Sequence, residues 1–373
     1  MKVAICGYPP LAQQIQRDLK AEDIEFKFFV GDLVSDRGED AEFTTELPTI
    51  NFFEFRRLVD AGELDGLVVA EDGRRDFTKA VVQTCKFYRI PKLGLLDLLY
   101  QNGLYWADVE KSFIVYAEAN IVDGCNLNCK ACTHFSPLFK PNEIYPLENF
   151  QRDIRQLAKC CDIITFRLIG GEPLLLKNLD EYIKITRRYL PNSSLRIATN
   201  GLLIPSLPQK ILDAIRENSF EIDITLYPPT VKILDKIEAV CVPNEILCNL
   251  IPFDKPETFN VNMSLRGDSD PIKSQRVCVN DTCRFLRDGK IYKCPVEALS
   301  YRFAEKFGLE NFPKPSGVDL YAQNVSEMLS MLDRNPVELC HWCSERTRKI
   351  PWEVARPPKL EDWLVNPDEL TNR

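Results

Sequence analysis

Short apolar segments of strand length alternate with longer amphipathic segments along most of the chain, and this alternation restricts the possible folds more than any other feature. From about residue 112 onward, a helix is predicted between each strand and the next. Strands are predicted at residues 113–122, 163–169, 195–198, 221–226 and 246–251, and helices at 147–159, 179–189, 208–217 and 231–240. This order favours a full or partial parallel barrel, whose active site lies in the loops that follow the strands.

The first 105 residues repeat this alternation on a smaller scale. Strands are predicted at residues 3–6, 25–30 and 66–70, and helices at 11–20, 52–60 and 77–88. The order favours a Rossmann-like α/β domain. Its first turn contains Gly7, Tyr8, Pro9 and Pro10, whereas a dinucleotide-binding fold has three spaced glycines there. We therefore expect this domain to dock a partner or hold part of a substrate, with a nucleotide site as the alternative.

Regular periodicity fades after about residue 270, where cysteines return. The predicted fold class is α/β, with a partial parallel barrel between a Rossmann-like domain and a small cysteine-rich domain. We expect the barrel to begin after the linker at residues 101–103. The predicted domains are residues 1–105, 112–269 and 270–350, followed by a proline-interrupted tail at residues 351–373.

The charge balance excludes some classes of partner. The chain has 47 Lys and Arg residues against 55 Asp and Glu, a formal net charge of −8, and it lacks the basic stripe of a nucleic-acid-binding protein. The N-terminus does not resemble a secretory signal, and no stretch of about 18 apolar residues predicts a membrane span. We expect a cytoplasmic protein with neither a nucleic-acid nor a membrane partner.

Cysteine is abundant, with 14 residues, and in a reducing compartment thiolates bind metal more often than they form disulfides. Cys125, Cys129 and Cys132 form a C-x3-C-x2-C loop directly after a predicted strand, a spacing expected about 0.02 times by chance at this cysteine frequency. Three thiolates can hold a 4Fe-4S cluster and leave one iron without a protein ligand. The alternatives are zinc, with His134 as the fourth ligand, and buried free cysteines.

Two further motifs follow the next strands in order. Ile169 precedes the sequence Gly-Gly-Glu-Pro, and Ala198 precedes Thr-Asn-Gly. With the cysteine loop, these motifs make the chain similar to the radical SAM superfamily over about residues 112–255. The resemblance implies that the three cysteines hold a 4Fe-4S cluster while S-adenosylmethionine binds the open iron. It also implies a cofactor site formed by Gly170, Gly171, Glu172, Pro173, Thr199 and Asn200.

The individual residues of these motifs suit such roles. A Cβ at Gly170 or Gly171 would keep the backbone away from the methionine portion of the cofactor. Glu172 can accept a hydrogen bond from a ligand ammonium group. Many family members have an aromatic residue before the third cysteine, near the adenine, but this chain has Ala131 there. Phe135 or His134 is therefore the expected substitute.

More cysteines follow the barrel. The pair Asp288-Gly289 predicts a hairpin turn that brings its flanking segments together. The pattern resembles the twitch domain, a short relative of the SPASM domain, which implies one auxiliary 4Fe-4S cluster. The implied ligands are Cys278, Cys294, Cys340 and Cys343, with Cys283 as a competitor of Cys278 and structural zinc as an alternative occupant. The other cysteines are expected to be small buried hydrophobic residues: Cys6, Cys85, Cys160, Cys161, Cys241 and Cys248.

The resemblance also implies the reaction. Cleavage of S-adenosylmethionine by one electron from an external donor, such as flavodoxin or ferredoxin, gives a 5′-deoxyadenosyl radical that abstracts a hydrogen atom. The combination of this barrel and a short C-terminal domain resembles radical SAM dehydrogenases of aminocyclitols, which favours oxidation of a sugar, cyclitol or nucleotide-linked sugar. Arg167 and Tyr227 are the predicted catalytic residues near the barrel mouth. The alternatives are a peptide-modifying or epimerising radical SAM enzyme, and a non-catalytic iron-sulfur protein that transfers electrons or acts as a scaffold.

Overall fold

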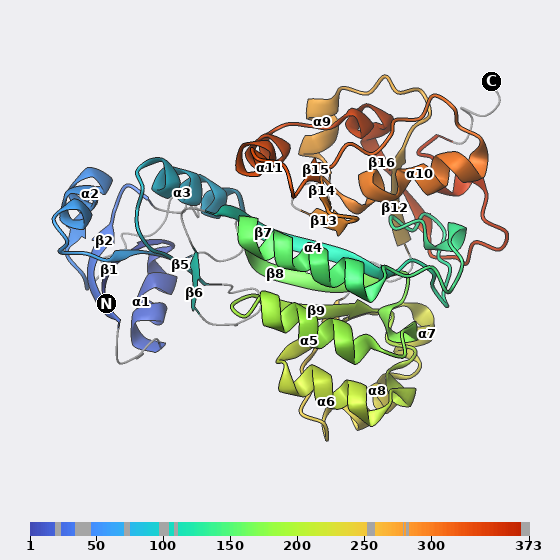
Figure 1. The fold of residues 1–373 in the computed structure, drawn as a ribbon, viewed down its shortest axis with the longest axis horizontal. Coiled ribbons are helices and arrows are strands. Elements are labelled where there is room, and N and C mark those ends of the chain that lie inside the picture. The colour runs from blue at the N-terminus through green and yellow to red at the C-terminus, as the bar shows by residue number, and fades with distance from the viewer. Residues whose placement is uncertain are drawn as a thin grey trace. The chain divides into compact units, whose positions relative to one another are not determined.

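The computed structural model describes residues 1–18, 24–33, 46–70, 75–96, 104–107, 111–251, 258–278, 280 and 283–366. The end of the helix predicted at residues 11–20 and the linker predicted at residues 101–103 lie outside these residues. The chain divides into two compact units, residues 1–115 and 116–373 (Figure 1). Across the described residues, every helix is too short or too polar to cross a membrane.

The first unit is a sheet flanked by helices, as the alternation predicts. Its strand order is β3-β2-β1-β4-β5-β6, and the strands are parallel except that β6 runs antiparallel to β5. The strands are β1 (Lys2–Gly7), β2 (Glu25–Val30), β3 (Thr49–Ile50), β4 (Gly66–Ala70), β5 (Leu93–Leu96) and β6 (Leu104–Ala107), and the helices are α1 (Pro9–Asp18), α2 (Phe52–Asp60) and α3 (Arg75–Phe87). The Rossmann-like order is confirmed, although the short strands β3, β5 and β6 were not predicted.

The second unit contains an eight-stranded sheet in the order β11-β10-β9-β8-β7-β13-β14-β15. Its parallel part consists of β7 (Ser112–Val122), β8 (Cys161–Gly170), β9 (Ser194–Thr199), β10 (Phe220–Thr225) and β11 (Cys248–Ile251). The helices between them are α4 (Leu147–Cys160), α5 (Leu179–Tyr189), α6 (Gln209–Glu217), α7 (Pro228–Val231) and α8 (Leu234–Cys241). Since β11 and β15 end the sheet without pairing with each other, the barrel is partial, as predicted.

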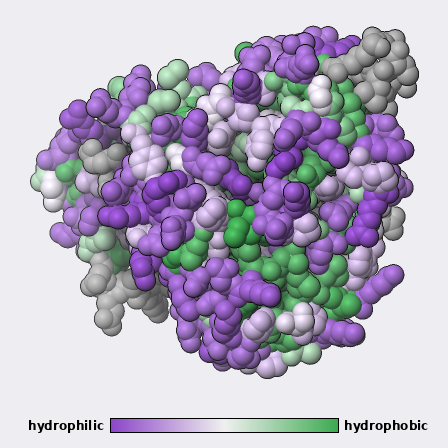
Figure 2. Space-filling view, turned by 45° about the vertical axis from the view of Figure 1, so that its right-hand side comes forward, coloured by the Kyte–Doolittle hydropathy of each residue, from purple (hydrophilic) through white to green (hydrophobic). Residues whose placement is uncertain are grey.

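Beside the open edge at β11, the apolar residues Leu247 and Leu250 are 57% and 48% exposed. Figure 2 shows apolar side chains gathered on the lower part of one face of an otherwise mostly hydrophilic surface. An edge strand with exposed apolar side chains fits a sheet that stops rather than closes into a full barrel.

The cysteine-rich region continues the same sheet. Strands β13 (Arg284–Arg287) and β14 (Lys290–Tyr292) form the predicted hairpin, with Asp288 and Gly289 at φ 48° and 73° in its turn. Because β13 pairs in parallel with β7, the hairpin extends the barrel sheet. The remaining elements are β12 (Thr258–Met263), which pairs with β16 (Cys343–Pro351), the short strand β15 (Val318–Asp319), and the helices α9 (Pro271–Arg276), α10 (Pro295–Phe307) and α11 (Val325–Arg334). The domain boundary between residues 269 and 270 stays a prediction.

Candidate active site

The cysteine loop follows β7 immediately and brings its three thiols together. Burial raises the pKa of Cys125 to about 11 and that of Cys129 to about 12. The neighbouring Cys132 raises the pKa of both thiols further, and Cys125 also raises that of Cys129. The Leu127 amide donates a hydrogen bond to Cys125 Sγ over 3.3 Å. Clustered thiols with N–H donors directed at sulfur are the surroundings in which a cluster thiolate is stable, so this donor set fits an iron-sulfur cluster.

The two glycines at the end of β8 are required by a contact inside the chain. A Cβ at Gly170 would lie 2.0 Å from the Val122 carbonyl oxygen, and a Cβ at Gly171 would lie 2.1 Å from that of Gly124. The Gly171 amide donates to the Val122 carbonyl over 2.8 Å. The glycines therefore let the end of β8 pack against the residues just before Cys125, whereas the close approach to a cofactor predicted from the sequence remains untested.

Glu172 joins the second motif to the third. Its carboxylate is fully buried and accepts hydrogen bonds from the Leu174 amide at 3.0 Å, the Thr199 hydroxyl at 2.7 Å and the Asn200 amide at 2.9 Å. Burial raises the pKa of Glu172 to about 7, against the lowering effect of these donors. Pro173 then begins a short 3-10 turn. A role for Glu172 toward a ligand ammonium stays a prediction, since its acceptor positions already bind groups of the chain.

Asn200 joins the third motif to the cysteine loop. Its side-chain amide donates to Asn126 Oδ1 over 2.7 Å and lies 3.8 Å from Cys125 Sγ. The Thr199 Oγ1 also accepts a hydrogen bond from the Gly201 amide. The structure thus brings the cysteine loop, the glycine turn and the Thr-Asn-Gly turn to one place, at the carboxyl ends of β7, β8 and β9. The contacts of Thr199 and Asn200 with a ribose remain predictions.

The two candidates for the missing aromatic contact are both engaged elsewhere. The ring of Phe135 has no exposed surface and packs against Phe303 and Trp363. The His134 Nδ1 lies 2.8 Å from Asn120 Oδ1, and burial lowers its pKa. Both side chains therefore have structural partners, and a contact of Phe135 with an adenine stays a prediction.

The predicted catalytic residues lie in two different surroundings. Arg167 pairs with Asp223 at 2.6 Å and lies over the Tyr116 ring, on the face of the sheet opposite the helices. Tyr227 hydrogen-bonds to the Cys129 thiol, and burial raises its pKa well above the ordinary value of 10. A phenol that stays protonated is a poor base, so Tyr227 belongs with the cysteine loop instead.

A buried polar layer on the inner face of the sheet was missed in the sequence. Arg196 and Asp223 are fully buried and pair at 3.1 Å, and Arg196 also pairs with Glu221. On β7, Glu118 accepts a hydrogen bond from the Tyr116 hydroxyl. The available signal was the placement of charged residues at alternate positions between apolar residues of predicted strands, which puts them on one face.

The C-terminal cysteines form a second group. Its four thiols are linked by electrostatic interactions: Cys294 interacts with Cys278 and Cys343, and Cys343 also interacts with Cys278 and Cys340. Burial raises the pKa of Cys294 and Cys343 well above the ordinary value for a thiol. Cys283 also interacts electrostatically with the Tyr116 phenol, and the choice between Cys278 and Cys283 as the ligand stays open. Within the described part of the chain, no three Cys, His, Asp or Glu side chains converge on a single-ion site.

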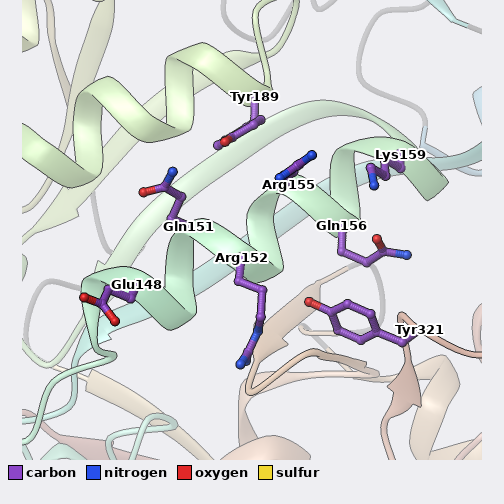
Figure 3. Close-up of a pocket in the computed structure, with 8 residues that line it drawn as sticks. All are labelled: Glu148, Gln151, Arg152, Arg155, Gln156, Lys159, Tyr189 and Tyr321. Carbon is purple, nitrogen blue, oxygen red and sulfur yellow. The ribbon is translucent and has the colours of Figure 1, made fainter.

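A groove of about 480 Å³ lies elsewhere, on the outer side of α4 (Figure 3). Figure 3 shows α4 running between Tyr189 on one side and Tyr321 on the other. The lining residues are Glu148, Gln151, Arg152, Arg155, Gln156, Lys159, Tyr189 and Tyr321. None of them belongs to the three motifs, so this groove is not assigned to the cofactor.

Comparison with known proteins agrees with the motif assignment. Residues 119–247 match the model of the Radical SAM superfamily. GTP 3′,8-cyclase of Nautilia profundicola is 34% identical over 106 residues, which cover 27% of this chain and 32% of that protein. GTP 3′,8-cyclase of Sulfurimonas denitrificans is 30% identical over 154 residues, which cover 37% of this chain and 46% of that protein. The chain thus spans less than half the length of these curated relatives.

Among solved structures, BtrN in complex with AdoMet and 2-DOIA aligns with a TM-score of 0.38 and 18% identity, over 62% of this chain and 94% of that chain.

The superfamily match begins within β7 and ends just before β11. It therefore includes the cysteine loop, the glycine turn and Asn200, which the structure brings together. The chain contains a radical SAM domain, a domain that uses a 4Fe-4S cluster and S-adenosylmethionine.

Proposed function

We propose that the chain oxidises a small hydroxylated substrate, namely a sugar, a cyclitol or a nucleotide-linked sugar, by radical SAM chemistry. The observation that carries the proposal is the second group of thiols, formed by Cys278, Cys294, Cys340 and Cys343. Four thiolates can ligate every iron of a 4Fe-4S cluster, which leaves no open iron for a second cofactor. Such a cluster suits electron transfer, and a substrate radical loses one electron when it is oxidised.

The residues of the three motifs have complementary roles in this proposal. Cys125, Cys129 and Cys132 hold the first cluster, while Asn200 and Glu172 keep the surrounding turns in place. When bound, this cluster and S-adenosylmethionine supply the 5′-deoxyadenosyl radical, and the auxiliary cluster supplies an acceptor for one electron. The reducing electron comes from an external donor such as flavodoxin or ferredoxin.

The polar layer of the sheet gives the proposal a place for a hydroxylated substrate. Arg167, with 17% of its side chain exposed, and the carboxylates of Glu118 and Asp223 lie on the inner face of β7, β8 and β10. Guanidinium and carboxylate groups bind hydroxyls, and a carboxylate can accept the hydroxyl proton when a carbinol becomes a ketone. We therefore assign substrate binding to this layer and the base to one of its carboxylates, in place of Tyr227.

The test begins with anaerobic reconstitution with iron and sulfide, followed by incubation with a reductant and S-adenosylmethionine. Formation of 5′-deoxyadenosine supports the radical reaction, and it should disappear when Cys125, Cys129 and Cys132 are all replaced by Ala. Cys160→Ala is the matched control, because this thiol bonds to Gln156 and lies outside both groups. Protein that carries zinc, or that forms no 5′-deoxyadenosine with any reductant, would contradict the proposal.

Substrate class is tested with a panel of deuterated polyols, aminocyclitols and sugar nucleotides. Deuterium should enter 5′-deoxyadenosine, and the product should be a ketone two hydrogens lighter than the substrate. A second candidate is a rearrangement of a purine nucleotide, which the sequence identity to GTP 3′,8-cyclases favours. In that case GTP, rather than a polyol, would transfer its hydrogen, and the product would retain the oxidation level of GTP.

A further inference from the structure

The segment formed by residues 352–364, which we call the C-terminal strap, pairs with the cysteine loop. The Lys130 amide donates to the Glu353 carbonyl over 2.8 Å, and the Ala355 amide donates to the Asn128 carbonyl over 2.7 Å. Between these bonds, Cys129 and Val354 face each other as an antiparallel bridge. The strap therefore adds a short strand to the loop that carries the first group of cysteines.

The pairing brings one hydrogen-bond donor, Trp352, to Cys129, whose sulfur also has Tyr227 as a second donor. The Trp352 indole N–H donates to Cys129 Sγ over 3.1 Å, and the Tyr227 hydroxyl bonds to the same thiol. The two rings lie beside each other, with centroids 6.0 Å apart, and Tyr227 also stacks on Phe259 at 6.2 Å. Cys129 itself is only 7% exposed. Its sulfur thus meets donors from the protein in a largely dry setting.

The Trp352 indole fixes the direction of its hydrogen bond to Cys129. An indole N–H only donates, so Cys129 Sγ must be the acceptor, as a thiolate bound to iron would be. Reduction of a cluster adds negative charge to its sulfurs, and a hydrogen bond to a ligand sulfur stabilises the reduced state more than the oxidised state. The bond is also stronger where water is excluded.

We propose that Trp352 and Tyr227 are positioning residues that raise the reduction potential of the cluster held by the cysteine loop, through their hydrogen bonds to Cys129. The inference rests on the proposed function, since it requires a cluster at Cys125, Cys129 and Cys132. According to this inference, the strap makes reduction of the cluster more favourable. Trp352 reaches the sulfur only when the strap is paired with the loop.

The strap supplies its own matched control. The Trp363 indole N–H donates over 2.9 Å to the backbone carbonyl of Cys132, not to a sulfur. Its ring packs against Phe135 and Phe303. Trp363→Phe therefore removes the same kind of donor from the same segment, at a ring that is more deeply buried, while Trp352 and Tyr227 remain in place.

The experiment compares wild type, Trp352→Phe, Tyr227→Phe and Trp363→Phe after anaerobic reconstitution. Redox titrations without substrate, monitored by EPR, give the midpoint potentials of the clusters. Addition of S-adenosylmethionine identifies the signal of the cluster with an open iron. We expect the midpoint potential of that cluster to shift to more negative values in Trp352→Phe and Tyr227→Phe, and to stay at the wild-type value in Trp363→Phe. Iron content should remain at the wild-type level in all four proteins.

A second measurement does not depend on how a variant folds. In wild-type protein labelled with ¹⁵N-indole tryptophan, electron-nuclear double resonance of the reduced cluster should show a coupled indole proton and nitrogen. An intact cluster without this coupling, or an unchanged potential in Trp352→Phe, would overturn the inference while leaving the proposed function in place. Failure of the wild type to form a cluster with an open iron would overturn both.

Discussion

Replacing Glu172 by Gln should remove a pH-dependent loss of stability from the apo protein. The Glu172 carboxyl is fully buried, and its pKa is raised by burial from 4.5 to about 7. Because the folded-state pKa lies above the unfolded one, the stability associated with the protonated carboxyl is fully present below pH 4.5 and is lost as the pH rises through 7. Gln stays neutral throughout this range.

The magnitude follows from the difference between the two pKa values. At about 1.4 kcal/mol per pKa unit, a shift from 4.5 to about 7 lowers the free energy of unfolding by about 3 kcal/mol at alkaline pH. The side chain has no exposed surface, so solvent screening does not reduce this value. The Gln side chain keeps two acceptor contacts but directs an N–H toward the Asn200 amide. This unfavourable contact lowers the free energy of unfolding of the variant by about 1–3 kcal/mol, and by the same amount at every pH.

The assay is urea unfolding of both apo proteins at pH 5, 6, 7 and 8. Fluorescence of Trp342, Trp352 and Trp363 follows the second unit, and a Trp106→Phe background removes the signal of the first. The difference between wild type and Glu172→Gln should change by most of the expected amount across this range, with wild type losing stability relative to the variant. A difference that is constant with pH would refute the reasoning, because it would mean that Glu172 titrates equally in both states.

Further predictions concern other parts of the chain. Gly171→Ala should destabilise the fold by about 2–4 kcal/mol, measured by thermal unfolding, because its Cβ would lie 2.1 Å from the Gly124 carbonyl oxygen. Cys340→Ala with Cys343→Ala should roughly halve the bound iron, while cleavage of S-adenosylmethionine stays measurable. Burial would raise the pKa of Asp153, but hydrogen bonds from Arg152, Tyr145 and Tyr321 outweigh it and lower the pKa. Asp153→Asn should therefore be less stable than wild type above pH 4, and the two free energies of unfolding should converge as the pH falls further. A difference in stability that persists in acid would contradict this.

Much of the second unit was predictable because its information is local. Apolar segments and turns placed β7, β8, β9 and β10 to within about two residues, and the motif residues lie at the ends of these strands. The pairing of β13 with β7 was not predictable in the same way, because it joins residues about 170 positions apart. The turn at Asp288 and Gly289 indicated the hairpin but carried no information on which strand the hairpin would join.

The polar layer and the strap show two different reasons for what was missed. A charged residue such as Arg196 is predicted to be exposed when it is considered alone. Its burial is energetically tolerated only because carboxylates on a neighbouring strand pair with it. The strap reads as a proline-interrupted tail because it lacks periodicity of its own. Its bonds to the cysteine loop join Lys130 to Glu353 across 223 positions, a relation that no local pattern contains.

The strap also offers a physical reason for the residue that departs from the family pattern. Ala131 is buried, has a positive φ of 55° and packs against Val261, Ile350 and Phe259. Those neighbours belong to β12 and β16, and β16 leads directly into the strap, so an aromatic side chain at this position would have to displace both strands. The space beside the third cysteine is filled from the distant end of the chain, and the strap that follows β16 brings an indole donor to Cys129 Sγ. Ala131 packs against the β12–β16 pair and Trp352 follows β16 directly, so the small residue and the indole donor to Cys129 Sγ both depend on the position of this strand pair.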